Sequence, residues 1–292
     1  MKKCLNCDFV YESVAWGCPS CGVVPPIVGG VVRLAPELDE SCEGFDSSVF
    51  EFLAEREAGS FWFASRNKMI EWGLKKFFPE TESLLEAGCG TGFVLSHIER
   101  SFPGIRVCGA EAFSRGLEFA AKRLSPRAEL IQMDATRVPF YEEFDVVCAF
   151  DVLEHIENDT GALAGMFEAA KPGGGILVTV PQHQWLWSKY DEMSFHRRRY
   201  GARELKEKIE AAGFAIERMT SFMTLLFPAM LASRMVWMIS SGREVSTELR
   251  PGLMNAAMER IMGAERAAVK AGARLPFGGS LLVVAKKTIP CS

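Results

Sequence analysis

The chain has no excess of basic residues and no apolar leader at its start. Its 33 Lys and Arg residues are outnumbered by 37 Asp and Glu, which gives a net charge of −4 at pH 7. Such a chain has no overall positive field to concentrate nucleic acid, so we do not expect a nucleic-acid partner. Met1-Lys2-Lys3 leads into Cys and Asp rather than an apolar segment. We therefore expect no secretory signal and a cytoplasmic location.

The chain also lacks a clean apolar run long enough for a membrane span. Residues 222–240 are strongly apolar, but Pro228 and Arg234 interrupt them, and a span needs about 20 apolar residues. No internal repeat or low-complexity tract is present. The remaining composition, 48% hydrophobic and 24% charged, is that of a folded globular protein.

Four of the nine cysteines form two Cys-x-x-Cys pairs. The pairs are Cys4 with Cys7 and Cys18 with Cys21, and ten residues separate Cys7 from Cys18. In a reducing compartment such pairs indicate metal more often than disulfide, and four thiolates converge tetrahedrally on one zinc ion. We predict a structural zinc ribbon over residues 1–30, with a role in structure or docking. A redox pair and metal-free cysteines are the alternatives.

Residues 31–80 are predicted to form a linker and a helical cap. A Pro-Pro pair, a Gly-Gly pair and several acids give residues 23–43 the composition of a linker. From residue 45 to 78 the apolar spacing is helical. Arg66 and Asn67 stand beside the aromatic run 61–63. We expect them to cover a bound ligand; the alternative is that the aromatic run packs this helix onto a sheet.

A glycine-rich turn organises the rest of the chain. Residues 83–92 read Ser-Leu-Leu-Glu-Ala-Gly-Cys-Gly-Thr-Gly, which predicts a strand, a tight turn and then a helix. The third glycine comes two residues after the second, whereas a dinucleotide fingerprint needs three. Glu86 suits the cationic end of S-adenosylmethionine better than a pyrophosphate. Glu111 closes the next strand, near the offset of about 20 residues at which an acid meets ribose hydroxyls.

Strands and helices alternate after this turn. We predict strands at 84–87, 106–110, 129–133, 144–150, 176–180 and 214–221, and helices at 93–101, 115–124 and 202–212. This alternation predicts an α/β fold with a parallel, doubly wound sheet and ligands at the carboxyl ends of its strands. We assign the core to residues 81–222.

Together these motifs resemble the class I S-adenosylmethionine-dependent methyltransferases over roughly residues 83–181. The Phe-Trp-Phe-x-x-Arg-Asn run at residues 61–67 resembles one found in bacterial methyltransferases with an N-terminal zinc ribbon. The resemblance implies a Rossmann-like, seven-stranded sheet whose last strand, at 275–288, is antiparallel. A helical insert at 223–274 would precede that strand.

The resemblance also implies which residues bind the cofactor. The glycine loop would hold the methionine part, Glu111 the ribose, and Asp134 or Ala135 the adenine, although Asp134 could instead cap a helix. The predicted cofactor-binding residues are Arg66, Asn67, Glu86, Ala87, Gly88, Cys89, Gly90, Gly92, Glu111, Ala112, Asp134, Ala135, Phe150, Asp151 and Val152.

We predict that the residues that take part in the reaction lie just after the strand 144–150. His155 is a candidate base for an acceptor that carries a proton, and Asp151 would orient it or the substrate. His155 could instead only hold the loop. Asp151, Glu154 and His155 also resemble the metal-ligating Glu-x-x-Glu-His of ubiquinone-biosynthesis O-methyltransferases, except that Asp replaces the first Glu.

Residues 182–200 form the loop expected to face the acceptor. His183, His196 and Tyr200 are our further catalytic candidates. The arginines 197–199 would engage an anionic group, and Trp185 and Trp187 would form apolar walls. The alternative is a packed loop with a solvated basic turn.

The predicted insert is rich in methionine. It would cover the active site, form a homodimer face or contact a membrane surface peripherally. Our leading hypothesis is an S-adenosylmethionine-dependent enzyme that methylates a small-molecule or lipid-like acceptor. The alternatives are an RNA or protein methyltransferase docked through the zinc ribbon, and a non-catalytic S-adenosylmethionine-binding protein.

Overall fold

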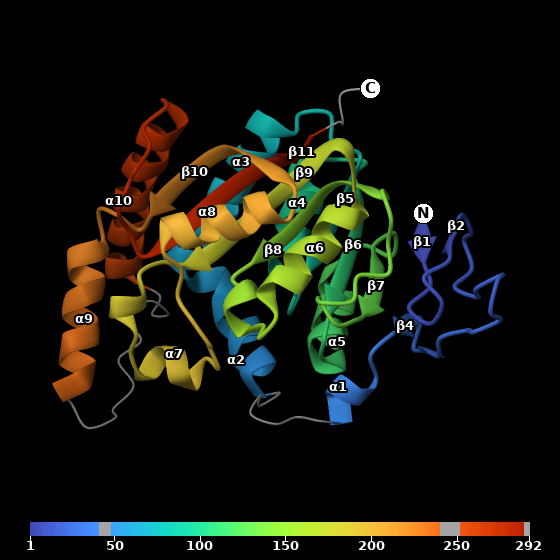
Figure 1. The fold of residues 1–292 in the computed structure, drawn as a ribbon. Helices are drawn as coiled ribbons and strands as arrows, with labels where there is room; N and C mark the ends of the chain where they lie inside the picture. The colour runs from blue at the N-terminus through green and yellow to red at the C-terminus, as the bar shows by residue number, and fades with distance from the viewer. Residues whose placement is uncertain (41–47, 240–251, 289–292) are drawn as a thin grey trace.

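A single large sheet forms the centre of the molecule. The computed structural model describes residues 1–40, 48–239 and 252–288, and shows nine strands in the order β10-β11-β9-β8-β5-β6-β7-β4-β3 (Figure 1). The strands are β3 (Ile27–Val28), β4 (Val31–Arg33), β5 (Ser83–Ala87), β6 (Arg106–Glu111), β7 (Glu129–Gln132), β8 (Phe144–Phe150), β9 (Ala170–Pro181), β10 (Phe214–Phe222) and β11 (Ser280–Lys287).

The seven predicted strands are all present in this sheet. The pairs β4–β7, β7–β6, β6–β5, β5–β8 and β8–β9 are parallel, and β11 is antiparallel to both β9 and β10. The Rossmann-like, doubly wound α/β fold with an antiparallel last strand is therefore confirmed.

Two short strands make the sheet larger than the seven strands predicted. β3 and β4 form a hairpin, and β4 pairs in parallel with β7. Val32 is buried there, and the buried amide of Gln132 accepts a hydrogen bond from Ala35 N at 3.1 Å. Residues assigned to the ribbon and linker thus extend the core. They were missed because two or three residues are too few to show a strand period.

Helices cover both faces of the sheet (Figure 1). Apolar side chains of α6 (Asp159–Ala169) and α8 (Ala202–Ala211) pack on one face. The opposite face is covered by α3 (Phe61–Phe77), α4 (Phe93–Ser101), α5 (Ser114–Arg123) and α10 (Leu253–Lys270). The shorter helices α1 (Glu37–Glu40), α2 (Ser48–Arg56) and α7 (Lys189–Met193), together with α9 (Phe227–Ile239), complete the described fold. Residues 41–47 of the predicted linker and 240–251 of the predicted insert lie outside the described residues.

The cysteine-rich segment lies beyond the β7 and β4 side of the sheet (Figure 1). It contains the two-stranded sheet of β1 (Lys2–Lys3) and β2 (Val10–Tyr11). Lys3 N donates to Pro139 O at 2.9 Å, and Tyr141 N donates to Met1 O at 2.9 Å. These backbone bonds attach the segment to the loop before β8.

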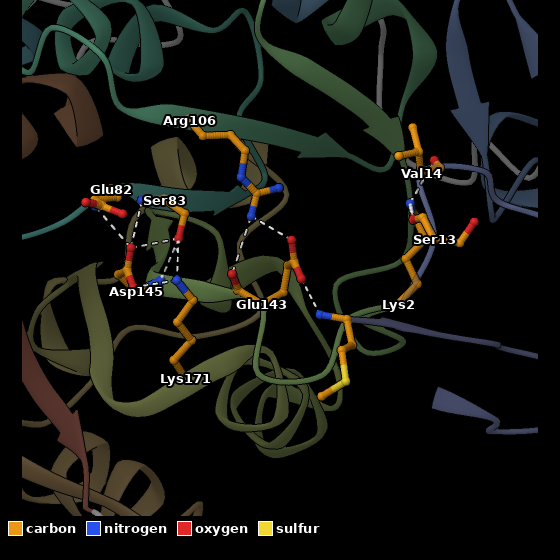
Figure 2. A network of polar contacts seen from close by, with 10 residues as sticks. Lys2, Ser13, Val14, Glu82, Ser83, Arg106, Glu143, Asp145 and Lys171 are labelled. Atoms are coloured by element: carbon orange, nitrogen blue, oxygen red, sulfur yellow. Dashed lines mark hydrogen bonds and ion pairs between the residues drawn. The ribbon is translucent and has the colours of Figure 1, made fainter. Parts of the chain in front are cut away.

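A polar network ties the amino ends of β5 and β8 together (Figure 2). The Asp145 carboxylate accepts hydrogen bonds from Ser83 N at 2.8 Å and Glu82 N at 3.0 Å, and it pairs with Lys171 at 2.7 Å. Burial alone would raise the pKa of Asp145, but these partners outweigh burial and lower the pKa below its usual value. The network therefore stabilises the folded chain through the ionised carboxylate.

We predict that Asp145→Asn lowers the free energy of unfolding at pH 7 by about 1 to 3 kcal/mol, because the donors of Glu82, Ser83 and Lys171 lose a charged acceptor. The pKa of Asp145 is lower in the folded chain, so its stabilisation is present above the unfolded pKa of about 3.9 and is lost as the pH falls through the folded value. Urea unfolding from pH 7 to pH 3 should show the difference from wild type shrinking below about pH 4. Glu207→Gln, in an exposed pair with Arg203, is the control. A difference that stays constant down to pH 3 would contradict the electrostatic explanation.

Candidate functional site

A cavity of about 1550 Å³ follows the carboxyl ends of the central strands. Its walls include Glu86 from β5, Glu111 from β6, Phe150 from β8 and Pro181 from β9. Side chains of α2, α3, α7 and α9 close the remaining sides. Strand ends of a parallel sheet are where ligands bind in this architecture.

The turn after β5 presents bare backbone to this cavity. Gly88, Gly90 and Gly92 all have positive φ, at 76°, 51° and 73°. A Cβ on Gly88 would lie 2.4 Å from the Val152 side chain, whereas a Cβ on Gly90 would meet only Phe50, at 3.9 Å. Gly88 is therefore required by packing, while Gly90 leaves space above the N-terminus of α4. Such a terminus offers N–H groups to a ligand.

Glu111 is held against the same turn. Its carboxylate accepts hydrogen bonds from Gly90 N at 2.9 Å, Ala112 N at 2.8 Å and Phe113 N at 3.3 Å. Burial raises the pKa of Glu111, and these three bonds oppose the shift. The acid at the end of β6 thus contacts the glycine turn directly.

Asp134 follows β7 and lines the cavity. Its Oδ1 atom accepts from Thr136 N at 2.7 Å and from Thr136 Oγ1 at 2.8 Å. Asp134 therefore closes a local turn, and no helix begins at this described residue, so it does not act as a helix cap. It remains on the cavity wall beside Ala135.

The N-terminal cap joins the cavity at the end of β8. Arg66 of α3 forms an ion pair with Asp151, and its guanidinium lies 4.7 Å from the centroid of the Trp62 ring. Asp151 has a φ of 56°, which is uncommon for a residue other than glycine. Burial raises the pKa of the nearby Glu86 well above its usual value, and the Arg66 charge offsets part of that shift.

A second buried contact anchors the cap to the glycine turn. Glu57 accepts hydrogen bonds from the Thr91 hydroxyl at 2.7 and 2.8 Å and pairs with Arg123 at 2.8 Å. Phe50 of α2 lies over the turn and lines the cavity. Sequence reasoning missed these residues because Glu57, Thr91 and Arg123 lie on three separate segments, and no single motif contains them.

Most of the predicted cofactor-binding residues share this one cavity. Those on its wall are Arg66, Glu86, Gly88, Cys89, Gly90, Glu111, Ala112, Asp134, Ala135, Phe150, Asp151 and Val152. Asn67, Ala87 and Gly92 are not on its wall. Asn67 is buried within α3, and Gly92 packs against Ala120 of α5.

Three of the predicted catalytic residues, Asp151, His155 and His196, also line the cavity. The rings of His155 and His196 have centroids 4.9 Å apart. His155 Nδ1 donates to Phe195 O at 3.3 Å, and His196 Nδ1 donates to the Asp191 carboxylate at 3.0 Å. Nδ1 of each ring is therefore occupied, and no described residue is a hydrogen-bond partner of either Nε2 atom.

Glu154 joins the two histidines. Its side chain is fully buried, and neither carboxylate oxygen has a hydrogen-bond partner among the described residues. Burial raises the pKa of Glu154 well above its usual value, and the Asp151 charge adds to the shift. Glu154, His155 and His196 place one ligand atom each within 4.8 Å of one another. Such a group could hold a divalent metal ion or accept a proton from a substrate.

His183 and Tyr200 lie away from the cavity wall. The Tyr200 side chain is fully buried, and its hydroxyl donates to Asp159 at 2.7 Å. His183 packs against Phe277, with ring centroids 4.5 Å apart. Neither residue is among those brought together around Asp151.

The three consecutive arginines of the loop point to different partners. Arg197 pairs with Glu157 at 2.5 Å, and Arg198 pairs with Asp159 at 3.1 Å. Arg199 is buried, lines the cavity and pairs with Asp191 at 2.5 Å. Trp185 and Trp187 are not on the cavity wall, whereas Met223 and Met230 of the predicted insert are.

The four predicted metal ligands converge at the N-terminal segment. The sulfur atoms of Cys4, Cys7, Cys18 and Cys21 all lie within 4.8 Å of one another. Cys4 and Cys21 are 3.6 Å apart, and Cys7 and Cys18 are 3.7 Å apart. This group fits a tetrahedral thiolate site.

Within residues 1–40, 48–239 and 252–288, no helix is both long and apolar enough to cross a membrane.

Comparison with known proteins identifies the family. Residues 54–218, 165 of the 292 in the chain, match a family described as a methyltransferase domain. A probable S-adenosylmethionine-dependent methyltransferase of Mycolicibacterium smegmatis is 30% identical over 140 residues, covering 46% of this chain and 52% of that protein. A malonyl-[acyl-carrier protein] O-methyltransferase of Halalkalibacterium halodurans is 25% identical over 128 residues, covering 42% and 47%. The chain thus spans about half the length of these two relatives.

A solved structure shares the fold. Phosphoethanolamine N-methyltransferase 2 of Haemonchus contortus, in complex with S-adenosyl-L-methionine, matches with a TM-score of 0.57 at 20% identity, covering 89% of this chain and 61% of that one. The family match extends from the cap into β10 and includes the glycine turn, Glu111 and Asp151. The chain belongs to the class I S-adenosylmethionine-dependent methyltransferases.

Proposed function

We propose that the chain transfers the methyl group of S-adenosylmethionine to a small-molecule or lipid-like acceptor. One observation carries this proposal: the cavity that contains the glycine turn and Glu111 also contains Asp151, His155 and His196. Donor and acceptor can therefore lie in the same cavity, and placement in line is the main requirement of a methyl displacement. The malonyl and phosphoethanolamine groups after which two similar proteins are named are small acceptors, which supports a small acceptor here.

The residues of the cavity divide into two proposed roles. S-adenosylmethionine, when bound, supplies a methyl group on a positively charged sulfur. The backbone of the glycine turn, Glu111 and the Arg66–Asp151 pair would hold this cofactor. The free Nε2 atoms of His155 and His196 would accept a proton from an acceptor that carries one.

We propose that Cys4, Cys7, Cys18 and Cys21 hold a structural zinc ion. Their four sulfur atoms are the donor set that zinc prefers in closed sites, and none of the four lines the cavity. The cytoplasmic location, a homodimer and contact with a membrane surface stay predictions.

We predict that Gly90→Arg abolishes binding of S-adenosylhomocysteine, because the side chain would enter the space above the turn. The positive φ of this residue adds a cost of about 1 to 2 kcal/mol in stability. Gly104→Arg is the matched control, since Gly104 also has a positive φ, of 94°, a Cβ there would meet no atom within 4 Å, and the residue has no part in the cavity. Calorimetric titration should detect binding of S-adenosylhomocysteine to the wild type and to Gly104→Arg, but not to Gly90→Arg. Wild-type affinity in Gly90→Arg would contradict this site.

Labelling can identify the acceptor class. Cell extract incubated with the purified chain and S-adenosylmethionine carrying a radioactive methyl group should incorporate label into the small-molecule or lipid fraction, and Gly90→Arg should incorporate none. Label confined to RNA or protein would support docking through the ribbon instead. Tight binding of the cofactor with no labelled fraction would support a non-catalytic binding protein.

We predict that the double variant Cys18→Ser, Cys21→Ser loses the zinc ion, about one per chain, but binds S-adenosylhomocysteine with the affinity of wild type. Elemental analysis and calorimetry test the two parts separately. Cys148→Ala, which removes a buried thiol of β8, is the control for zinc content. Unchanged zinc in the double variant would rule out the ribbon site.

A further inference from the structure

Two arginines share one buried carboxylate at the acceptor side of the cavity. Asp191 on α7 is fully buried. Its Oδ1 atom pairs with Arg199 Nη1 at 2.5 Å, and its Oδ2 atom lies 3.3 Å from Arg234 Nη1. Arg199 and Arg234 both line the cavity. Their convergence on a single acid leaves one guanidinium charge at this wall without a full counter-charge.

Asp191 is also bound by donors other than the two arginines. Its Oδ1 atom also accepts from His196, and its Oδ2 atom accepts from Ser188 N at 2.9 Å and Ser188 Oγ at 3.0 Å. The contact with Arg234 is the longest of this set. Burial alone would raise the pKa of Asp191, but the His196 hydrogen bond and the two arginine charges outweigh it and hold the pKa below its usual range. Asp191 is therefore an ionised, fully occupied anchor.

The two arginines differ in the donors that remain. Arg199 uses Nε for Gln182 O at 3.0 Å, Nη1 for Asp191, and Nη2 for Gly279 O at 3.2 Å. Arg234 uses Nη1 for Leu186 O and Asp191. In the part of the chain that the structure describes, Nε and Nη2 of Arg234 have no acceptor. Arg199 is thus a structural brace, whereas Arg234 keeps donors for a ligand.

Two other acids of this wall have partners of their own. Glu157 pairs with Arg197, and Glu192 is exposed on α7, where it accepts from Trp187 Nε1 at 3.4 Å. The side chain of Arg234 is only 15% exposed, so water screens its charge poorly. A partly buried guanidinium with free donors binds carboxylate or phosphate oxygens well.

Arg234 also has a defined position relative to the imidazole rings. Asp191 binds His196 through Oδ1 and contacts Arg234 through Oδ2, and His196 packs against His155. One carboxylate therefore sets the separation between the proposed proton acceptors and Arg234. An acceptor that reaches both would present its nucleophile to the histidines and its charge to Arg234.

We infer that the methyl acceptor carries an anionic group, a carboxylate or a phosphate, that binds to Arg234 of α9. This inference rests on the proposed methyl transfer, and it identifies the chemical class of the acceptor. It also changes the sequence-based expectation, which placed anion binding on residues 197–199. Arg197 and Arg198 are paired with Glu157 and Asp159. Arg199 is occupied, and the role falls to an arginine of the helical insert.

Direct binding of two simple anions tests the inference. The purified chain is first loaded with S-adenosylhomocysteine, and inorganic phosphate or acetate is then titrated calorimetrically at constant ionic strength. We expect at least one of them to bind, and Arg234→Gln to weaken that binding about tenfold or more, because a charge-assisted pair is lost. Arg234→Lys keeps the positive charge but loses the planar guanidinium with its paired donors, so it should weaken binding less than Arg234→Gln. The anion that binds more tightly indicates whether the charged group of the acceptor is a phosphate or a carboxylate.

Arg203→Gln is the matched control, because it removes the same charge from a side chain that is 91% exposed on α8. It should bind the anion as wild type does. Retained affinity for S-adenosylhomocysteine shows that Arg234→Gln is folded and that the cofactor site is intact. Absence of binding by both anions, equal affinity in Arg234→Gln, or an equal loss in Arg203→Gln would each overturn the inference. Failure of the proposed function is distinct, since it would appear as no binding of S-adenosylhomocysteine in the first step or as no labelled fraction in the extract experiment.

Discussion

The close packing of the glycine turn after β5 is the constraint on which the site depends. Val152 after β8 occupies the space that a side chain on Gly88 would need, and Ala120 of α5 does the same at Gly92. Two neighbouring elements thus close directly on the backbone of the turn. Glu111 of β6 accepts a hydrogen bond from Gly90 N of the turn. The cavity wall on this side is therefore set by backbone geometry that forms with the core itself.

The N-terminal cap is attached to the core by ion pairs, whereas the glycine turn is held by packing against its backbone. Glu57 pairs with Arg123 beside Thr91, and Arg66 pairs with Asp151. Removing one partner of a buried pair costs about 3 to 5 kcal/mol, whereas replacing both with apolar residues often costs little. Such pairs therefore fix the position of the cap on the core, and their net contribution to stability is small. The position of Phe50 over the turn follows from the same anchoring.

Local signals in the sequence predicted the core well. The strand, turn and helix around residues 83–101 have a clear apolar period and a glycine pattern, and the structure has the helix at Phe93–Ser101 as predicted. β3 and β4 are too short to show a period, so their place in the sheet depends on contacts with β7. Sequence patterns of this length cannot reveal such contacts.

The loop 182–200 shows a different limit of prediction. His183, His196 and Tyr200 are near in sequence, but only His196 reaches the cavity. His183 and Phe195 have φ values of 66° and 55°, which turn the chain sharply within the loop. The three arginines that follow these turns also face different partners, Glu157, Asp159 and Asp191. Arg234 could not be found in this way, because its contact with Asp191 joins segments 43 residues apart.

The charges of the cavity are arranged in two groups, and this arrangement bears on the proposed reaction. Glu86, Glu111 and Asp151 surround the glycine turn, whereas Arg199 and Arg234 line the wall beyond the two histidines. Under the proposed function, the cofactor would lie on the side of the acidic groups and an anionic acceptor on the side of the arginines. The two ligands would thus meet between these groups. Because Asp191 links His196 to Arg234, the same carboxylate that positions a proton acceptor would also determine which acceptors fit.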